Sequence, residues 1–135
     1  MFKVPFRKST TIRTVEPALS GDFTYAEIAS MARVGTLVHF RSGETLIAEG
    51  TEGVSAYFIT SGSAAVSRGD ESLAVLRSGD LVGERALVTG EPRNATVTAL
   101  MPVTALQIDR EQFAWLRLEW TKLKAMSLDL VEARS

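Results

Sequence analysis

The feature that most constrains the fold of this chain is a series of short strand-like segments between residues 36 and 108. Each segment is rich in β-branched or aromatic residues, and turn signals built on glycine separate it from the next. This pattern is typical of an all-β barrel or a double-sheet jelly roll. The dipeptide Gly69-Asp70 predicts a tight hairpin between two of the segments. The expected strands are TLVHF (36–40), TLIAE (45–49), AYFIT (56–60), AAVSR (64–68), SLAVLR (72–77), ATVTAL (95–100) and VTALQI (103–108).

A helix is expected before these strands. Thr24 and Glu27 have the spacing of a capping box, in which each side chain satisfies a backbone N–H at the helix start, so a helix over residues 24–34 is predicted. Gly35 should end it, because glycine can adopt the left-handed conformation that often follows a helix.

A helical region is also expected after the strands, from Asp109 to Ser135, with Asp109 as its N-cap and a break near Trp120-Thr121. Its apolar residues recur at spacings that can form stripes. They are Phe113, Leu116, Leu123, Met126, Leu130 and Val131. The element order predicts a mainly β fold with flanking helices.

The chain of 135 residues fits one domain. We place that domain at residues 20–135, after a basic N-terminal arm at residues 1–19. The arm is interpreted either as a solvated chain end or as a contact with anionic lipid or a partner. Its basic residues are Lys3, Arg7, Lys8 and Arg13.

The composition excludes several classes of protein. The net charge is −1 with both signs spread along the chain, which argues against a general nucleic-acid binder. The absence of cysteine excludes disulfides and thiol chemistry. We find neither the apolar segment of a signal peptide nor an apolar run of membrane length, so we expect a cytoplasmic protein with no transmembrane segment.

Catalysis is not expected. His39 is the only histidine, so a multi-histidine metal site of the cupin type cannot be built within one chain. We interpret His39 as a half-buried strand residue and predict no metal, no catalytic residue and no cofactor. No serine lies in a nucleophile-elbow context. The sequence therefore favours a binding protein over an enzyme.

The best candidate binding site is the string GERALVTGEPRNAT, which begins at Gly83. A short helix is expected near Glu84, where unpaired backbone N–H groups can bind an anion. Gly83 lets the backbone approach a ligand, and Ala86 and Ala95 are small enough not to block it. Arg93 offers a planar fork that fits two oxygens of a phosphate.

The carboxylate of Glu84 has a complementary role, because it can accept a hydrogen bond from a sugar hydroxyl. A ligand that carries both a phosphate and a sugar hydroxyl would use Glu84 and Arg93 together. The alternative is a salt bridge between these two residues, or two unrelated surface charges.

This string resembles the phosphate-binding cassette of cyclic nucleotide-binding domains, the family found in cyclic-nucleotide-dependent kinases, channels and catabolite-activator-type regulators. The resemblance implies an eight-stranded β-roll, that is, a double-stranded β-helix or jelly roll, with an N-terminal helix and C-terminal helices. It extends over about residues 36–108 and the flanking helices. The matching residues are Gly83, Glu84, Ala86, Leu87, Pro92, Arg93, Ala95 and Thr96.

The resemblance also implies what the site residues do. Glu84 would bind the ribose 2′-hydroxyl, and Arg93 would bind the cyclic phosphate with help from backbone amides around Ala86 and Ala95. The base would lie against the β-roll, and the C-terminal helix would cover it as a lid. The alternative role of each residue proposed for this lid is packing in the core or in a dimer. The lid candidates are Leu123, Met126 and Leu130, with Trp120 as the weaker one.

Three residues depart from the family pattern. Val82 stands where many members have an aromatic residue and should still pack against the cassette. Arg85 stands where an apolar residue is frequent and should point to solvent or compete for Glu84. Asn94 stands where alanine often accompanies cAMP and threonine cGMP, and it can present a donor or acceptor to the base. We predict cAMP rather than cGMP as the ligand. The predicted ligand-binding residues are Gly83, Glu84, Arg85, Ala86, Arg93, Asn94 and Ala95.

The resemblance implies a stand-alone regulatory module, or a piece of a larger protein, that signals to an unidentified effector protein through movement of its C-terminal helices. No helix-turn-helix pattern follows the long helix, so we expect no DNA-binding domain in this chain. The sequence leaves open whether the protein forms a homodimer. The alternative function is a protein-interaction module of the same fold that no longer binds nucleotide.

Overall fold

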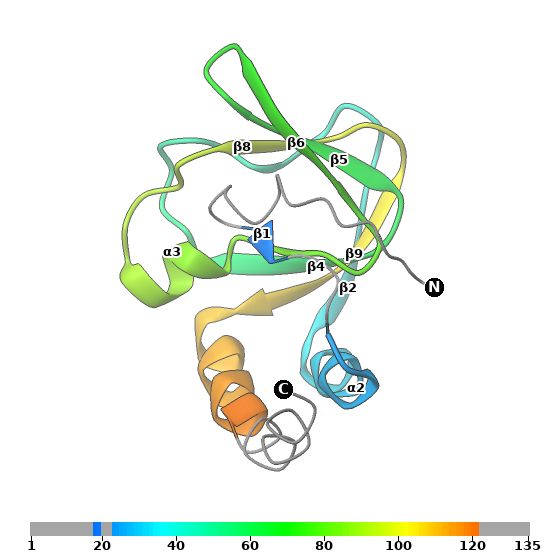
Figure 1. Cartoon of the computed structure of the whole chain (residues 1–135), viewed down its shortest axis with the longest axis vertical. Coiled ribbons are helices and arrows are strands. Elements are labelled where there is room, and N and C mark those ends of the chain that lie inside the picture. The colour runs from blue at the N-terminus through cyan, green and yellow to red at the C-terminus, as the bar shows by residue number, and fades with distance from the viewer. Residues whose placement is uncertain (1–17, 20–22, 122–135) are drawn as a thin grey trace, which may run out of the picture.

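The computed structural model describes residues 18–19 and 23–121. The strands form two antiparallel sheets, with the orders β1-β7-β4-β9-β2 and β3-β8-β5-β6 (Figure 1). The helices in the described residues are α2 (Tyr25–Val34), α3 (Glu84–Thr89) and a helix over residues 110–121. The strands are β1 (Ala18–Leu19), β2 (Thr36–Phe40), β3 (Thr45–Ile47), β4 (Ser55–Ser61), β5 (Ser63–Arg68), β6 (Glu71–Arg77), β7 (Leu81–Val82), β8 (Thr96–Ala99) and β9 (Val103–Asp109).

The mainly β fold is confirmed. Strands β2 to β9 form the eight-stranded roll, and β1 adds a short strand at the edge of the larger sheet. Arg68 pairs with Glu71, so Gly69 and Asp70 make the tight turn that was predicted between β5 and β6. Strand β7 was not predicted, because its two residues are too few to show an alternating pattern.

Two hydrophobic clusters hold the layers together. One fills the space between the two sheets, and the other lies between the larger sheet and the helices. The larger sheet is therefore covered on both of its faces, as a layered domain requires (Figure 1). Buried members of the first cluster include Ile59, Val66, Leu76, Val82, Val97 and Val103. Buried members of the second include Met31, Phe58, Leu81, Ile108, Phe113 and Leu116.

Helix α2 begins as predicted and ends by a different mechanism. Glu27 N donates to Thr24 Oγ1 over 3.1 Å, and Thr24 N donates to Glu27 Oε1 over 2.8 Å, which completes the capping box. Gly35 caps the other end but has an extended backbone with φ −79°, so the predicted left-handed conformation is wrong. A β-carbon there would lie 3.0 Å from Met31 O and 3.2 Å from Leu106 Cβ. Close packing against β9 therefore favours glycine at this position.

The C-terminal helix begins directly after β9. Asp109 is its N-cap, as predicted: Gln112 N donates to Asp109 Oδ1 over 2.8 Å, and Asp109 N donates to Gln112 Oε1 over 2.9 Å. Trp120 packs against the cluster beneath the sheet, and its Nε1 donates to Ser30 Oγ over 3.0 Å. Trp120 and Thr121 are both helical, and any break after them lies outside the described residues. The lid candidates Leu123, Met126 and Leu130 also lie outside those residues.

The prediction that His39 is half-buried is wrong. Val38 and Phe40 pack against the core from β2, and the alternation of the strand turns His39 outward, where it is exposed. Across the residues that the structure describes, no group of three or more His, Cys, Asp or Glu side chains is arranged to hold a metal ion. None of the described helices combines the length and the apolar character needed to cross a bilayer.

Candidate functional site

The predicted cassette is built where β7 passes into α3. Leu81 and Val82 are fully buried between strands, and Gly83 then turns the chain into the helix with φ 93°. Because L-residues with a β-carbon rarely adopt this conformation, glycine is needed for the turn itself. Val82 packs in the cluster between the sheets together with Ile47 and Ala95, so it packs against the cassette as predicted.

The second half of the cassette is a loop that follows α3, and its backbone is anchored to the turn after β3. Arg93 N donates to Thr51 O, and Gly50 N donates to Arg93 O, each over 2.8 Å. On the other side, Arg68 Nε donates to Asn94 O over 2.8 Å. These three bonds come from two different turns, so they fix where the Arg93 side chain starts.

The guanidinium of Arg93 lies inside the molecule. The residue is only 8% exposed. Its Nη1 donates to Gly83 O over 2.7 Å, and its Nη2 donates to Ser55 O. Burial lowers the pKa of Arg93 below its usual value, while the nearby Tyr57 and Glu84 act to raise it. A buried cation is costly unless it is well paired, and these hydrogen bonds end on neutral carbonyl oxygens.

Two glycines make room for this guanidinium. A β-carbon on Gly83 would lie 2.9 Å from Arg93 Nη1, and one on Gly53 would lie 3.0 Å from Arg93 Cζ. The Gly53 β-carbon would also come within 2.4 Å of Ala86 Cβ, at the start of α3. In the structure the group that lies close to Gly83 is Arg93, and the approach of a ligand to this glycine stays a prediction.

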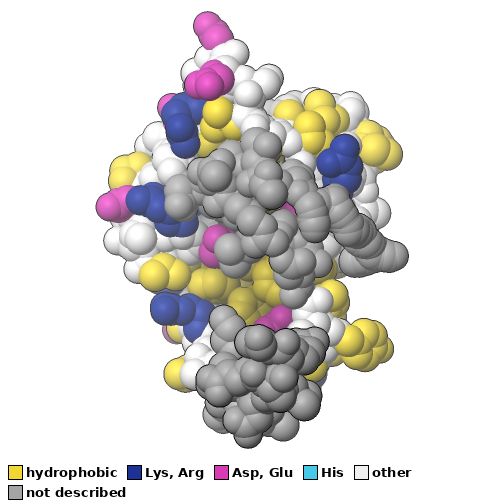
Figure 2. Space-filling model, in the orientation of Figure 1, with side chains coloured by type: hydrophobic (Ala, Val, Ile, Leu, Met, Phe, Trp, Pro, Cys, Tyr) yellow, Lys and Arg dark blue, Asp and Glu magenta, His cyan; other side chains and the backbone are white. Residues whose placement is uncertain are grey.

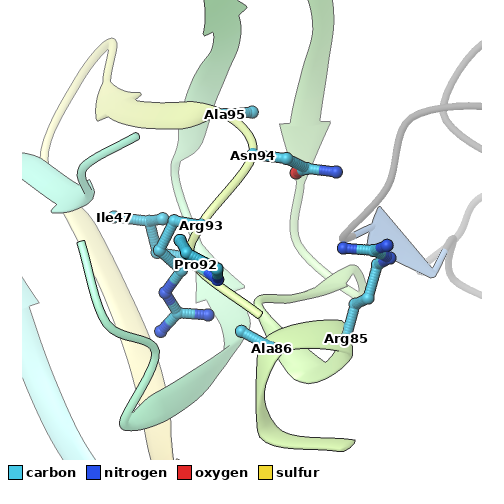
Figure 3. Close-up of a pocket in the computed structure, with 7 residues that line it drawn as sticks. All are labelled: Ile47, Arg85, Ala86, Pro92, Arg93, Asn94 and Ala95. Atoms are coloured by element: carbon cyan, nitrogen blue, oxygen red, sulfur yellow. The ribbon is translucent and has the colours of Figure 1, made fainter. Parts of the chain in front are cut away.

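Beside the guanidinium is a shallow hollow with room for about one water molecule; its volume rises to about 220 Å³ only when the open solvent at its mouth is counted. In Figure 3 the guanidinium groups of Arg93 and Arg85 lie on opposite sides of Ala86, and Asn94 lies above Ala86 in this view. Ala86 and Ala95 line this space with small side chains, and the prediction that they leave room for a ligand stays a prediction. The lining residues are Ile47, Arg85, Ala86, Pro92, Arg93, Asn94 and Ala95.

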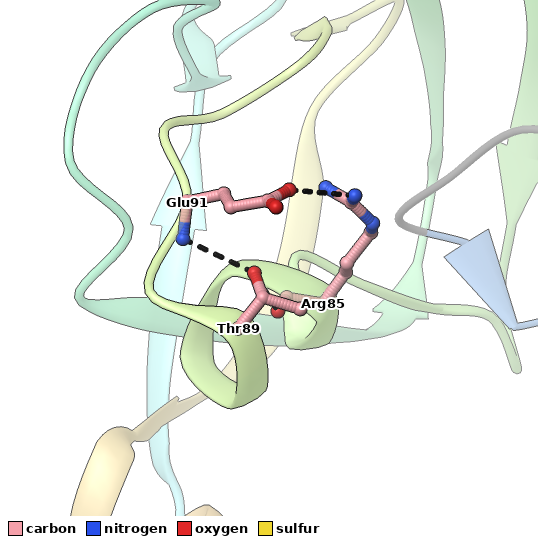
Figure 4. A network of polar contacts seen from close by, with 3 residues as sticks. All are labelled: Arg85, Thr89 and Glu91. Atoms are coloured by element: carbon pink, nitrogen blue, oxygen red, sulfur yellow. Dashed lines mark hydrogen bonds and ion pairs between the residues drawn. The ribbon is translucent and has the colours of Figure 1, made fainter.

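Arg85 is tied into the cassette. Its Nη2 donates to Glu91 Oε1 over 2.7 Å. The backbone N–H of Glu91 in turn donates to the hydroxyl oxygen of Thr89 (Figure 4). The Arg85 side chain is 32% exposed, so it lies at the rim of the hollow rather than fully in solvent. An exposed pair of this kind contributes about 0–1 kcal/mol to stability and serves mainly to orient the two side chains.

The structure thus gathers the predicted site residues in one place. Arg85, Ala86, Arg93, Asn94 and Ala95 line the hollow. The carbonyl of Gly83 accepts a hydrogen bond from Arg93. Glu84, at the start of α3, is half-buried, and its charge acts to raise the pKa of Arg93.

The sequence analysis missed four neighbours of Arg93: Ile47, Gly53, Ser55 and Tyr57. Ser55 acts through a backbone carbonyl, which no side-chain pattern reveals. Gly53 lies in a glycine-rich turn of the sequence. The turn by itself does not indicate that Arg93 lies close to Gly53 because this residue has no β-carbon.

A contact also joins the site to the C-terminal helix. Arg110, the first residue of that helix, donates from Nη2 to Gly53 O over 2.8 Å. Gly53 in turn packs against Arg93 and Ala86. The start of the helix is therefore separated from the buried guanidinium by a single glycine.

Chemically, the arrangement suits the binding of an anion. It offers a buried guanidinium, a rim arginine and small side chains around an open space. Elsewhere on the face shown in Figure 2, basic and acidic side chains are interspersed, with apolar side chains between them.

The family model described as cyclic nucleotide-binding domain matches residues 37–119. A cGMP-dependent protein kinase of Toxoplasma gondii is 42% identical over 73 residues, which cover 54% of this chain and 7% of that protein. A cAMP-dependent protein kinase regulatory subunit of Debaryomyces hansenii is 40% identical over 78 residues, which cover 57% of this chain and 17% of that protein. The chain thus spans only a small part of the length of these relatives.

Solved structures agree with this match. A structure described as cAMP-bound PfPKA-R has a TM-score of 0.62 and 30% identity, over 69% of this chain and 35% of that one. A PKAR CBD2 structure bound to Sp-2Cl-cAMPS has a TM-score of 0.67 and 25% identity, over 83% of this chain and 77% of that one. The catabolite activator protein of Thermus thermophilus shares the fold, with a TM-score of 0.67 and 24% identity over 84% of this chain and 55% of that one.

Proposed function

The chain belongs to the cyclic nucleotide-binding domain family, and on that premise we propose that it is a regulatory module that binds a 3′,5′-cyclic mononucleotide in the hollow beside Arg93. In this proposal the guanidinium of Arg93 binds the cyclic phosphate, and the carboxylate of Glu84 accepts a hydrogen bond from the ribose 2′-hydroxyl. Gly83, Ala86 and Ala95 keep the cassette backbone close to the ligand. Arg85 and Asn94 contact the ligand from the rim.

The observation that supports this proposal most is the burial of Arg93. A guanidinium carries more N–H groups than its bonds to Gly83 O and Ser55 O use. Both acceptors are neutral, so the positive charge is only partly compensated by them. A phosphate that enters the hollow would add negative charge to that which Glu84 already places near Arg93, and bidentate pairing of phosphate with arginine is a strong, geometrically specific contact.

For the base, we propose cAMP over cGMP. Asn94 lies at the rim of the hollow, where its amide can donate or accept a hydrogen bond. The relatives include a cGMP-dependent protein kinase and a cAMP-dependent protein kinase regulatory subunit, and the PfPKA-R and PKAR CBD2 structures described above are bound to cAMP and to Sp-2Cl-cAMPS. A titration with both nucleotides tests this preference directly.

We propose that the signal leaves the site through the C-terminal helix. Arg110 contacts Gly53, and Gly53 contacts Arg93, so a shift of the guanidinium toward a phosphate changes the environment of the first helical turn. A ligand can shift such an equilibrium only by binding one arrangement more tightly than the other. Hydrogen exchange in residues 110–121, with and without nucleotide, would report the shift.

In this role the domain is not itself an enzyme. It acts in the cytoplasm on an effector protein, and the homodimer stays a prediction. The second candidate function, a protein-interaction module that has lost the ligand, is less well supported because both Glu84 and Arg93 are present in the cassette. Absence of binding by any cyclic nucleotide at millimolar concentration would favour that candidate.

Calorimetry with cAMP and cGMP tests the site. Arg93→Ala should weaken binding by about 2–5 kcal/mol, because it removes the charged partner of the phosphate. Glu84→Ala should weaken it by about 1.5–3 kcal/mol, through the lost hydrogen bond to the ribose. Arg41→Ala, an exposed arginine outside the cassette, is the matched control and should bind like the wild type.

Because Arg93→Ala leaves two carbonyls without their donor, its fold must be checked by circular dichroism and thermal melting. Arg93→Lys is the second variant: it keeps a cation but cannot form the planar fork. Equal affinity in the wild type and all variants would show that the nucleotide does not bind here.

A further inference from the structure

The N-terminal arm reaches the nucleotide cassette through its last residues. Ala18 and Leu19 form β1, which pairs antiparallel with β7: Ala18 lies opposite Val82, and Leu19 lies opposite Leu81 (Figure 1). On its other side, β7 pairs with β4, where Tyr57 lies opposite Val82. The two-residue strand β7 is therefore held between one neighbour from the roll and one from the arm.

Strand β7 also leads directly into the site. Val82 is followed directly by Gly83, whose carbonyl receives Nη1 of Arg93 over 2.7 Å, and then by Glu84. A displacement of β7 must therefore move the Gly83 carbonyl and the start of α3. Without β1, β7 would be an edge strand paired only with β4, and unpaired edges are the least constrained part of a sheet.

We propose that β1 is a positioning element of the nucleotide site: by pairing with β7 it holds Gly83 and Glu84 in the arrangement that binds the cyclic nucleotide. The inference rests on the proposed function and deepens it, because it makes backbone pairing of the arm part of the binding site. Ala18 and Leu19 themselves act through β7 and do not touch the ligand.

The physical basis is preorganisation. A site whose binding-competent arrangement is only partly populated binds with an affinity reduced by that fraction. Pairing with β1 raises the population in which β7 and the Gly83 carbonyl are in place. By linkage, a nucleotide that prefers this arrangement must in turn stabilise the β1–β7 pairing.

The test uses the full chain and replaces each paired residue with proline, as Ala18→Pro and Leu19→Pro. Proline removes a backbone N–H and so weakens strand pairing. In an antiparallel pair, the N–H groups of neighbouring residues point to opposite sides, so one of the two variants should have the larger effect. Ala18→Val and Leu19→Val are the matched controls, because they change the same positions and keep the backbone N–H. We expect the affinity for cAMP to fall about three- to tenfold in the more affected variant and to be unchanged in the controls.

Two further readouts separate this proposal from the proposed function. In nucleotide-free protein, peptides that contain residues 81–83 should exchange hydrogen faster in the affected variant, and this comparison is valid even if no nucleotide binds. In the wild type, nucleotide should slow exchange at residues 18–19. Unchanged exchange at residues 81–83 in both proline variants would overturn the role of β1, as would wild-type affinity in both. A wild type that binds no cyclic nucleotide would overturn the proposed function instead.

Discussion

Replacing Gly83 with alanine should both destabilise the domain and weaken nucleotide binding. The backbone of Gly83 has φ 93°, a conformation that costs a residue with a β-carbon about 1–2 kcal/mol. The new β-carbon would also lie 2.9 Å from Arg93 Nη1, 2.9 Å from Ile47 Cδ1 and 3.2 Å from Ser55 O. Overpacking of this kind costs about 1–3 kcal/mol, so the free energy of unfolding should fall by about 2–5 kcal/mol in total.

Gly90→Ala is the matched control. Gly90 has φ 76° and caps the other end of α3, but an added β-carbon would meet nothing within 4 Å. Gly90→Ala should therefore lower the free energy of unfolding only by the cost of the backbone conformation, about 1–2 kcal/mol. The difference between the two variants therefore separates the crowding of Gly83 by Arg93, Ile47 and Ser55 from the backbone cost.

Urea denaturation followed by tryptophan fluorescence measures the stability difference, and calorimetry with cAMP measures the affinity. Because Gly83→Ala forces Arg93 away from its carbonyl partners, we expect its affinity to fall at least about tenfold, which corresponds to about 1.4 kcal/mol, while Gly90→Ala binds like the wild type. Equal losses of stability in the two variants, together with unchanged affinity in Gly83→Ala, would refute the argument that Gly83 holds the guanidinium in place.

Three further outcomes are expected. Burial raises the pKa of Tyr57 above its ordinary 10.0, so the unfolded chain loses this proton first and the free energy of unfolding should fall as the pH rises above 10.0; Tyr57→Phe should remove this dependence in urea titrations, and an identical pH profile would contradict it. Asp109→Ala removes the acceptor of the Gln112 backbone N–H and should lower stability by about 1 kcal/mol in thermal melts, whereas Asp109→Asn should retain most of it. Glu91→Gln breaks an ion pair whose side chains are 32% and 57% exposed, so stability should change by less than about 1 kcal/mol; a larger coupling in a double-mutant cycle with Arg85→Gln would show that the pair is structurally important.

Much of the roll was predictable because its signals are local. The capping box of Thr24 and Glu27, and the N-cap at Asp109, depend on residues three positions apart, and both are present. The turn at Gly69 and Asp70 likewise needs only its own sequence. Where a contact is made within a few residues, chain connectivity itself brings the partners together.

The errors arose where the partner is far away in the chain. The extended backbone of Gly35 follows from crowding by β9, and the exposure of His39 depends on which face of β2 meets the other sheet. Strands β1 and β7 are too short to be recognised alone and exist because they pair with each other and, for β7, with β4.

The amino-acid sequence by itself determined the order of the longer strands and the helices and placed Glu84 and Arg93 in one short cassette, since turn chemistry, alternation and a compact motif are all properties of neighbouring residues. Only the tertiary structure decided that Arg93 is buried against the carbonyls of Gly83 and Ser55 and that Gly53 leaves room for it. The reason is that every residue has a backbone carbonyl and many positions are glycine, so the sequence does not show which of them will contact Arg93. The fold decides this when it brings distant segments together around that side chain.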